Sequence, residues 1–315
     1  MREAVPGRGV VRQGVLTRAV LGLAACALTA LVYIPFVDSP FVLDDRTTVL
    51  LNPSLVDLSD WRGILSYDRW HPLVAVSFAV DRALSGVSPL GFHVTNGIVH
   101  LIAVALLFAL ASRSHPGETS STARTWAAFV AAAAFGLNPL TARSVAYISA
   151  RADLLFTVGL LLAAMLAWGA ARARSAVRVA VAAAVAIAAF AAVPWGFAAP
   201  HGPRRAYLAA AIVLLAAARF APPLFARSRA ARVTGVLAVA VLAFLTWRTL
   251  TLRSDPVALW RAEVERTPAA WDAHLGYADA LREASHCAEA AIEYKLVLRM
   301  RPGQEDARRG LDRCR

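Results

Sequence analysis

The chain has 315 residues, of which 58% are hydrophobic and 17% charged, and its mean hydropathy is +0.54. This composition argues against a soluble globule with a polar surface. The net charge is +12, and almost all of the positive charge comes from arginine, since Lys295 is the only lysine. We interpret this charge as a signal of membrane topology and of contact with anionic membrane lipid. No pattern of interleaved basic and aromatic residues occurs, so nucleic acid is not an expected partner.

Apolar runs of nearly the length that crosses a bilayer recur along the chain. They predict an all-α fold, a polytopic membrane helix bundle that occupies residues 19–250. The seven predicted spans are 19–37, 92–112, 125–140, 154–171, 177–199, 206–225 and 233–247.

Arginine predicts the orientation of these spans, because short loops rich in positive charge stay on the cytoplasmic side. With residues 1–18 inside, the inside segments hold twelve arginines, whereas the outside loop 38–91 carries seven aspartates and four arginines. Seven spans then place the C-terminal tail outside. The Ala- and Arg-rich composition is typical of GC-rich bacterial genomes, so the predicted location is a bacterial inner membrane with a periplasmic tail.

Two adjacent carboxylates, Asp44 and Asp45, follow the first predicted span in the stretch FVLDDRTTVLLNPS. Solvated surface groups are one interpretation, since acidic residues in polar loops usually face water. Catalysis is the other interpretation. Neighbouring carboxylates repel when ionised, which raises one pKa and suits a general base in a partly dehydrated pocket.

Polar side chains continue into the second predicted span. His93, Asn96 and His100 are spaced i, i+3, i+7 and therefore lie on one face of a helix. Polar groups at this depth are costly unless they face a cavity or the protein interior. A water-filled pocket near the outer surface and helix packing by buried histidines are both consistent with the stripe.

Charged residues also lie between the third and fourth predicted spans, in FGLNPLTARSVAYISARADLL. Arg143, Arg151 and Asp153 stand at a membrane surface in this stretch. Because guanidinium groups bind phosphate oxygens in a bidentate manner, the arginines suit a lipid that carries phosphate. Charged loop ends that only mark the interface are the alternative interpretation.

Residues 251–315 form a separate predicted module of amphipathic helices. Trp260 and Tyr294 are 34 residues apart, as are Pro268 and Pro302, and 34 is the period of the tetratricopeptide repeat. An ordinary helical hairpin is the alternative. Because solenoids need about three repeats to bury a core, this module is expected to contact the membrane domain or a protein partner.

Small and aromatic residues support the repeat assignment. Ala278 and Ala290 fall where small residues let two helices approach, and Tyr294 falls at a large aromatic position. Antiparallel packing would also bring Cys287 close to Cys314. We therefore predict a disulfide between them, as expected in an oxidising compartment.

The order of these motifs resembles a known family. The series FVLDD, NPS, HPLVAVSFAVDRALSGVSPLGFHVTNGIVHL and NPLTARSVAYISARADLL is followed by further spans and the tail. It resembles the transmembrane O-mannosyltransferases with tetratricopeptide repeats, which belong to the GT-C class of glycosyltransferases dependent on polyprenyl-phosphate sugars. The resemblance covers residues 38–170 and 255–315.

The resemblance implies transfer of mannose or another hexose, with inversion, from a polyprenyl-phosphate-linked sugar to a protein or glycan acceptor outside the membrane. Asp44 or Asp45 would act as the base on the acceptor hydroxyl or help to bind a divalent metal. The residues assigned to substrate binding are His71, His93, Asn96, His100, Arg143, Arg151 and Asp153.

The chain departs from the family pattern in two segments. Residues 71–73 read His-Pro-Leu where the family usually has Arg-Pro-Leu, and residues 138–143 lack the usual His-Pro followed by His and Glu. The membrane domain is also shorter than is usual in the family. A catalytically inactive membrane scaffold, whose tail recruits envelope proteins, is therefore the alternative function.

Overall fold

The structure is a computed structural model that describes residues 8–42, 45–67, 72–113, 121–173, 177, 180–185 and 206–314. The described residues form helices and the connections between them and contain no strand, which confirms the all-α prediction. The elements are α1 (Arg8–Tyr33), η1 (Ile34–Phe36), η2 (Arg46–Leu50), η3 (Pro53–Leu55), α2 (Trp61–Tyr67), α3 (Pro72–Ser85), α4 (Pro89–Arg113), α5 (Ser121–Gly136), α6 (Pro139–Ala146), η4 (Ile148–Ala150), α7 (Arg151–Ala173), α9 (Ala206–Phe220), α10 (Pro222–Arg227), α11 (Arg229–Arg253), α12 (Pro256–Arg266), α13 (Trp271–Glu283), α14 (Cys287–Met300) and α15 (Glu305–Arg313).

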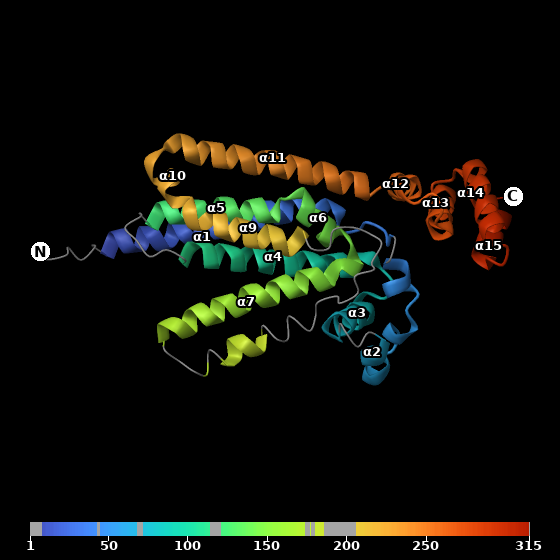
Figure 1. Cartoon of the computed structure of the whole chain (residues 1–315), viewed down its shortest axis with the longest axis horizontal. Helices are drawn as coiled ribbons and strands as arrows, with labels where there is room; N and C mark the ends of the chain where they lie inside the picture. Colours follow the sequence, from blue (N-terminus) through green and yellow to red (C-terminus); the bar gives the residue numbers. More distant parts are fainter. Residues whose placement is uncertain are drawn as a thin grey trace, which may run out of the picture.

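Long apolar helices make this chain an integral membrane protein (Figure 1). Among the described residues, α1, α4, α7 and α11 contain the four candidate spans, and the bent pair of α5 and α6 is a fifth candidate. Helix α9 is apolar but shorter. Six predicted runs coincide with α1, α4, α5, α7, α9 and α11, whereas 177–199 lies mainly outside the described residues, so the count of seven stays a prediction.

Helix α5 lies at the centre of the bundle and packs against α1, α4, α9 and α11. Its sequence allows this because most of its residues between 123 and 134 are alanine. Ala128, Ala132 and Ala133 are 0% exposed. Small side chains let helix backbones approach closely in a membrane, where dispersion contacts provide much of the attraction between helices.

Helix α5 ends at Gly136, and α6 starts at Pro139 with its axis turned by 51°. The sequence Asn-Pro produces this break. Pro139 lacks an N–H and suits the first helical turn, and the Asn138 side chain caps α6 by accepting the Leu140 N–H at 2.9 Å.

The break leaves three consecutive carbonyls, those of residues 135–137, without their usual helical partners. Thr141 Oγ1 donates to the carbonyl oxygen of Phe135 at 2.9 Å. His100 Nε2 lies 3.1 Å from that of Gly136, and Thr246 Oγ1 donates to that of Leu137 at 2.7 Å. Side chains from α6, α4 and α11 therefore satisfy backbone groups that would otherwise be unpaired in an apolar environment.

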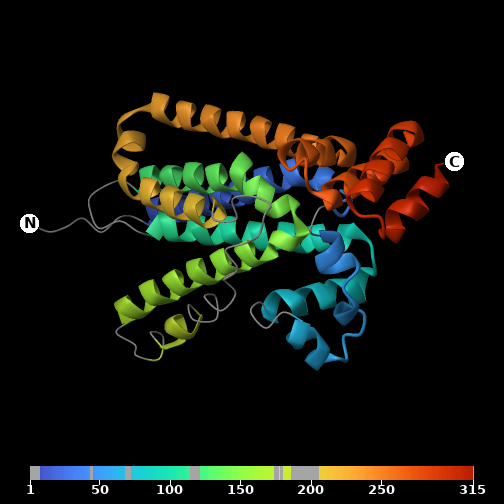
Figure 2. The same cartoon turned by 45° about the vertical axis from the view of Figure 1, so that its right-hand side comes forward.

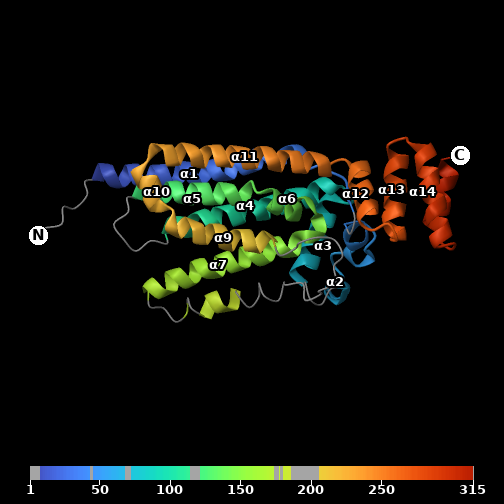
Figure 3. The same cartoon turned by 45° about the horizontal axis from the view of Figure 1, so that its top comes forward.

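The segments with predicted inside arginines gather at one end of the bundle. The start of α1, the end of α4, the start of α5 and α10 lie there, and α2, α3 and the C-terminal helices lie at the other end (Figures 1 and 3). This is the arrangement expected if the arginine-rich end faces the cytoplasm. The orientation itself stays a prediction.

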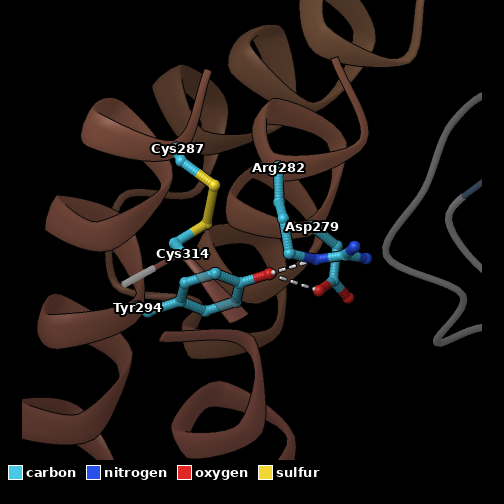
Figure 4. Close-up of a disulfide and its surroundings, with 5 residues drawn as sticks. All are labelled: Asp279, Arg282, Cys287, Tyr294 and Cys314. Carbon is cyan, nitrogen blue, oxygen red and sulfur yellow. Dashed lines mark hydrogen bonds between the residues drawn. A yellow bond between two sulfur atoms is a disulfide. The ribbon is translucent and has the colours of Figure 1, made fainter. Parts of the chain in front are cut away.

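Helices α12 to α15 follow α11 at the end of the bundle where α2 and α3 lie (Figure 2). Helices α13 and α14 form a hairpin, and Ala278, Ala290 and Tyr294 are 0% exposed between the helices. The Tyr294 hydroxyl donates to Asp279 at 2.7 Å and accepts from Arg282 at 3.2 Å (Figure 4). The buried positions are those that the repeat pattern predicts, although the assignment to the tetratricopeptide family stays a prediction.

The predicted disulfide is present and joins Cys287 at the start of α14 to Cys314, which follows α15, with Cα atoms 5.1 Å apart (Figure 4). Because it closes a loop of 27 residues, reduction should cost the module about 3–4 kcal/mol of stability. We expect faster amide exchange in α15 after reduction or in Cys287→Ser. The matched control Cys26→Ser changes a free cysteine and should leave exchange in α15 unaltered. Equal exchange in oxidised and reduced protein would contradict a stabilising role.

Candidate functional site

Asp45 is fully buried beyond the end of the first candidate span. Its Oδ1 accepts the Ser149 N–H at 2.7 Å, and its Oδ2 accepts the Val42 N–H at 3.5 Å. Burial raises the pKa of Asp45 to about 6, and the bonds from Ser149 and Val42 oppose part of this rise. A carboxyl group with this pKa is well suited to accept a proton near neutral pH.

A pocket that is partly open to solvent lies near this carboxyl group, with Val42 in its lining. Its lining is mainly apolar and comes from the end of α1, residues 37–42, α4, the end of α6, Leu250 of α11 and Leu259 of α12. Val42 and Tyr147 belong to the lining. Since Val42 donates to Asp45 and Ser149 follows Tyr147 by two residues, the carboxyl group lies directly behind the pocket wall.

Among the predicted site residues that the structure describes, His93 lines this pocket. It is buried, and its Nε2 lies 3.0 Å from the Ser39 carbonyl oxygen. This contact holds the imidazole against the segment that leads from α1 to Asp45. His93 and Asp45 therefore both contact the segment of residues 39–42.

Arg151 is 0% exposed and contacts four protein groups on two helices. Nε donates to Asn96 Oδ1 at 2.7 Å, and Nη2 donates to the carbonyl oxygen of Phe92 at 3.0 Å. Nη1 donates to Ser77 Oγ at 3.0 Å and pairs with Asp81 Oδ2 at 2.6 Å. These contacts hold α3 and α4 against the start of α7.

Asn96 connects this buried arginine to the pocket. Its side-chain amide donates to the carbonyl oxygens of Val145 at 3.3 Å and Tyr147 at 3.1 Å. Both of these residues line the pocket, and Ser149, which holds Asp45, follows them. The contacts from Arg151 through Asn96 therefore position the backbone that carries the pocket wall.

His100 lies deeper in the bundle and belongs to a different cluster. Its Nδ1 is 2.7 Å from the hydroxyl oxygen of Tyr207, and its Nε2 faces the carbonyl oxygen of Gly136. A carbonyl oxygen can only accept, so Nε2 must donate. The rings of Tyr33 and Phe135 pack around the imidazole. These contacts correspond to the helix-packing interpretation of the polar stripe.

The remaining predicted residues have different surroundings. Asp44 and His71 lie outside the described residues. Arg143 is half-buried on α6, and Asp153 is buried in the first turn of α7. Among the described residues, no group of three or more His, Cys, Asp or Glu side chains is arranged to hold a metal ion.

Asp81 is the residue of this region that the sequence prediction missed. It is buried, pairs with Arg151, and accepts a 2.7 Å hydrogen bond from Thr95. Its position four residues after Ser77 on α3 places both on one helix face. That spacing was the available signal, but only the contact with Arg151 makes Asp81 part of the site.

No protein family model and no solved structure matches the chain. Curated relatives do match. The chain is 30% identical over 144 residues to protein O-mannosyl-transferase Tmtc2 of Drosophila melanogaster and 31% identical over 144 residues to Tmtc1 of the same organism. It is 28% identical over 134 residues to protein O-mannosyl-transferase TMTC2 of Mus musculus.

These three alignments cover 41%, 42% and 38% of this chain but only 15%, 16% and 15% of the relatives. The chain thus spans about a sixth of the length of the curated relatives that it matches. The predicted resemblance to the O-mannosyltransferases is therefore supported over about two-fifths of the chain.

Proposed function

We propose that this membrane protein is a glycosyltransferase that moves mannose or another hexose from a polyprenyl-phosphate carrier to a protein or glycan acceptor at the end of the bundle where the pocket opens. The observation that carries the proposal is the buried carboxyl group of Asp45 behind the pocket wall. Similarity to proteins named O-mannosyl-transferases supports the reaction class.

In the proposed reaction the oxygen of the acceptor hydroxyl attacks C1 of the sugar, and Asp45 accepts the proton of that hydroxyl. The bond between C1 and the phosphate oxygen breaks, polyprenyl phosphate leaves, and the configuration at C1 inverts. The raised pKa of Asp45 suits this role, because a base that ionises near neutral pH can both accept and release the proton. The wall formed by Val42 and Tyr147 must open for the acceptor to reach the carboxyl group.

We assign binding of the donor's phosphate group to His93, which lines the pocket, and to Arg143, which is half-buried on α6. Arg151 has a different proposed role. Because its guanidinium group already contacts Asn96, Phe92, Ser77 and Asp81, it positions the pocket wall instead of binding phosphate directly.

The test is mass profiling of envelope proteins and glycolipids from a deletion strain. The strain is complemented with wild type, with Asp44→Asn/Asp45→Asn, or with Asp57→Asn/Asp60→Asn. The last variant is a matched control, because it neutralises two exposed carboxylates of the same loop. We expect a hexose-sized mass to return with wild type and with the control but not with Asp44→Asn/Asp45→Asn at equal membrane abundance. Equal rescue by all three proteins with no change in mass would refute the transferase and favour an inactive scaffold.

A further inference from the structure

Helix α3 turns its polar side chains toward the protein. Asp81 pairs with Arg151 at 2.6 Å, and Arg82 donates to two carbonyl oxygens of η2 at 3.0 and 3.1 Å. Ser77 and Ser85 donate to carbonyl oxygens of their own helix at 2.7 and 2.6 Å. Every charged or hydroxyl side chain of this helix thus has a protein partner.

The large apolar side chains on the opposite face of α3 point away from the protein. The outer stripe consists of Leu73, Val76, Val80, Leu84 and, just after the helix, Val87, which are 54%, 40%, 38%, 82% and 58% exposed. Their spacing of three or four residues places them along one helix face. A helix that borders water shows the reverse arrangement, with polar residues outside, so water does not suit this face.

The outer stripe continues onto a candidate membrane span. Only residues 86–88 separate α3 from α4, on which Leu90, Val94, Ile98 and Ile102 are 43%, 41%, 53% and 45% exposed at intervals of four residues. Because α4 is long and apolar enough to cross a bilayer, this α4 stripe suits lipid. The two stripes follow one another along the chain, with Val87 and Leu90 three residues apart at their junction.

The surroundings of α3 match a membrane surface. Helices α2 and α3 lie at the end of the bundle where α7 begins, on the flank that α7 occupies (Figures 1 and 3). Trp61 of α2 is 59% exposed, and the guanidinium carbon of Arg62 lies 5.1 Å from the centre of the Trp61 ring. Tryptophan is enriched where hydrocarbon meets the headgroups.

We propose that α3 is an interfacial helix whose outer stripe docks into the boundary between headgroups and acyl chains of the leaflet at this end of the bundle. The partner is therefore the lipid bilayer. This seating presses the buried face of α3 onto α4 and α7, and so holds Asp81 against Arg151. The proposal does not depend on the enzymatic function of the protein.

Spin-label accessibility in the full-length protein tests the proposal. Single cysteines are introduced as Val80→Cys and Leu84→Cys in a Cys26→Ala background, with the disulfide left intact. The protein is placed in nanodiscs of phosphatidylethanolamine and phosphatidylglycerol. Ile102→Cys serves as the lipid reference and Glu305→Cys as the water reference. Collision rates with oxygen, which favours lipid, and with a nickel chelate, which favours water, are then compared.

We expect labels at residues 80 and 84 to show a several-fold higher ratio of oxygen to nickel collisions than the label at 305, and a ratio below that at 102. A ratio equal to that at 305 would show that the stripe faces water and would overturn the proposal. Protection from both reagents would also overturn it, because a second copy of the chain would then cover the stripe. Labelled variants must retain the elution volume of the unlabelled parent, and the use of two positions guards against a local defect at either one.

Discussion

Asp45→Asn is expected to slow sugar transfer strongly and, at the same time, to stabilise the folded protein at neutral pH. Loss of the general base should lower the rate about 10²–10⁴-fold. The gain in stability follows from the pKa of Asp45, which burial raises to about 6. Above this pH the folded state must hold a buried carboxylate, whereas the unfolded chain ionises at its ordinary pKa.

The sign follows from proton binding. Between about pH 4 and pH 6 the folded state binds more protons than the unfolded state, so the free energy of unfolding falls as pH rises through this window. The full cost is about 3 kcal/mol above pH 6. An asparagine side chain cannot ionise, so Asp45→Asn should remove this cost at pH 7.5 and have little effect at pH 4.5.

Thermal unfolding in detergent micelles at these two pH values measures the effect, alongside transfer assays on the same preparations. Asp57→Asn is the matched control, because Asp57 is exposed and hydrogen bonds from Ser59 lower the pKa of its carboxyl group. The control should gain no stability at pH 7.5. An Asp45→Asn variant that stays active, or that is less stable at both pH values, would refute the proposed role and environment of Asp45.

Asp81→Asn should destabilise the protein by about 3–5 kcal/mol, because it removes the charge that compensates a buried arginine. The side chains of Arg151 and Asp81 are 0% and 7% exposed, so water cannot replace the lost partner. The effect should extend to the pocket, since Arg151 holds Asn96 and Asn96 holds the carbonyl oxygens of Val145 and Tyr147.

A double-mutant cycle isolates this ion pair. Asp81→Leu/Arg151→Met removes both charges and should recover most of the stability that either single change costs. Denaturant unfolding of Asp81→Leu, Arg151→Met and the double variant gives the coupling energy. Asp57→Asn again controls for the loss of one carboxylate. Additive losses would show that Arg151 and Asp81 do not act as a pair.

Apolar periodicity alone determined much of the architecture. The lengths of the apolar runs predicted α1, α4, α7 and α11, and the repeat pattern predicted that two helices approach at Ala278 and Ala290, which are 0% exposed. The pairing of Cys287 with Cys314 also followed from sequence, because antiparallel neighbouring helices bring such positions together. These features depend on contacts between residues that are near in sequence, so local patterns carry them.

Only the tertiary structure decided what the polar residues do. The spacing of His93, Asn96 and His100 correctly placed them on one helix face, yet His93 faces the Ser39 carbonyl, Asn96 binds Arg151, and His100 binds the broken end of α5. Those partners come from segments far apart in sequence, and one helix face does not specify which segments pack against it. The pairing of Asp81 with Arg151 likewise appears only when α3 packs between η3, α4 and α7. A buried charge takes its role from the groups that replace its water, and only the packed structure brings those groups together.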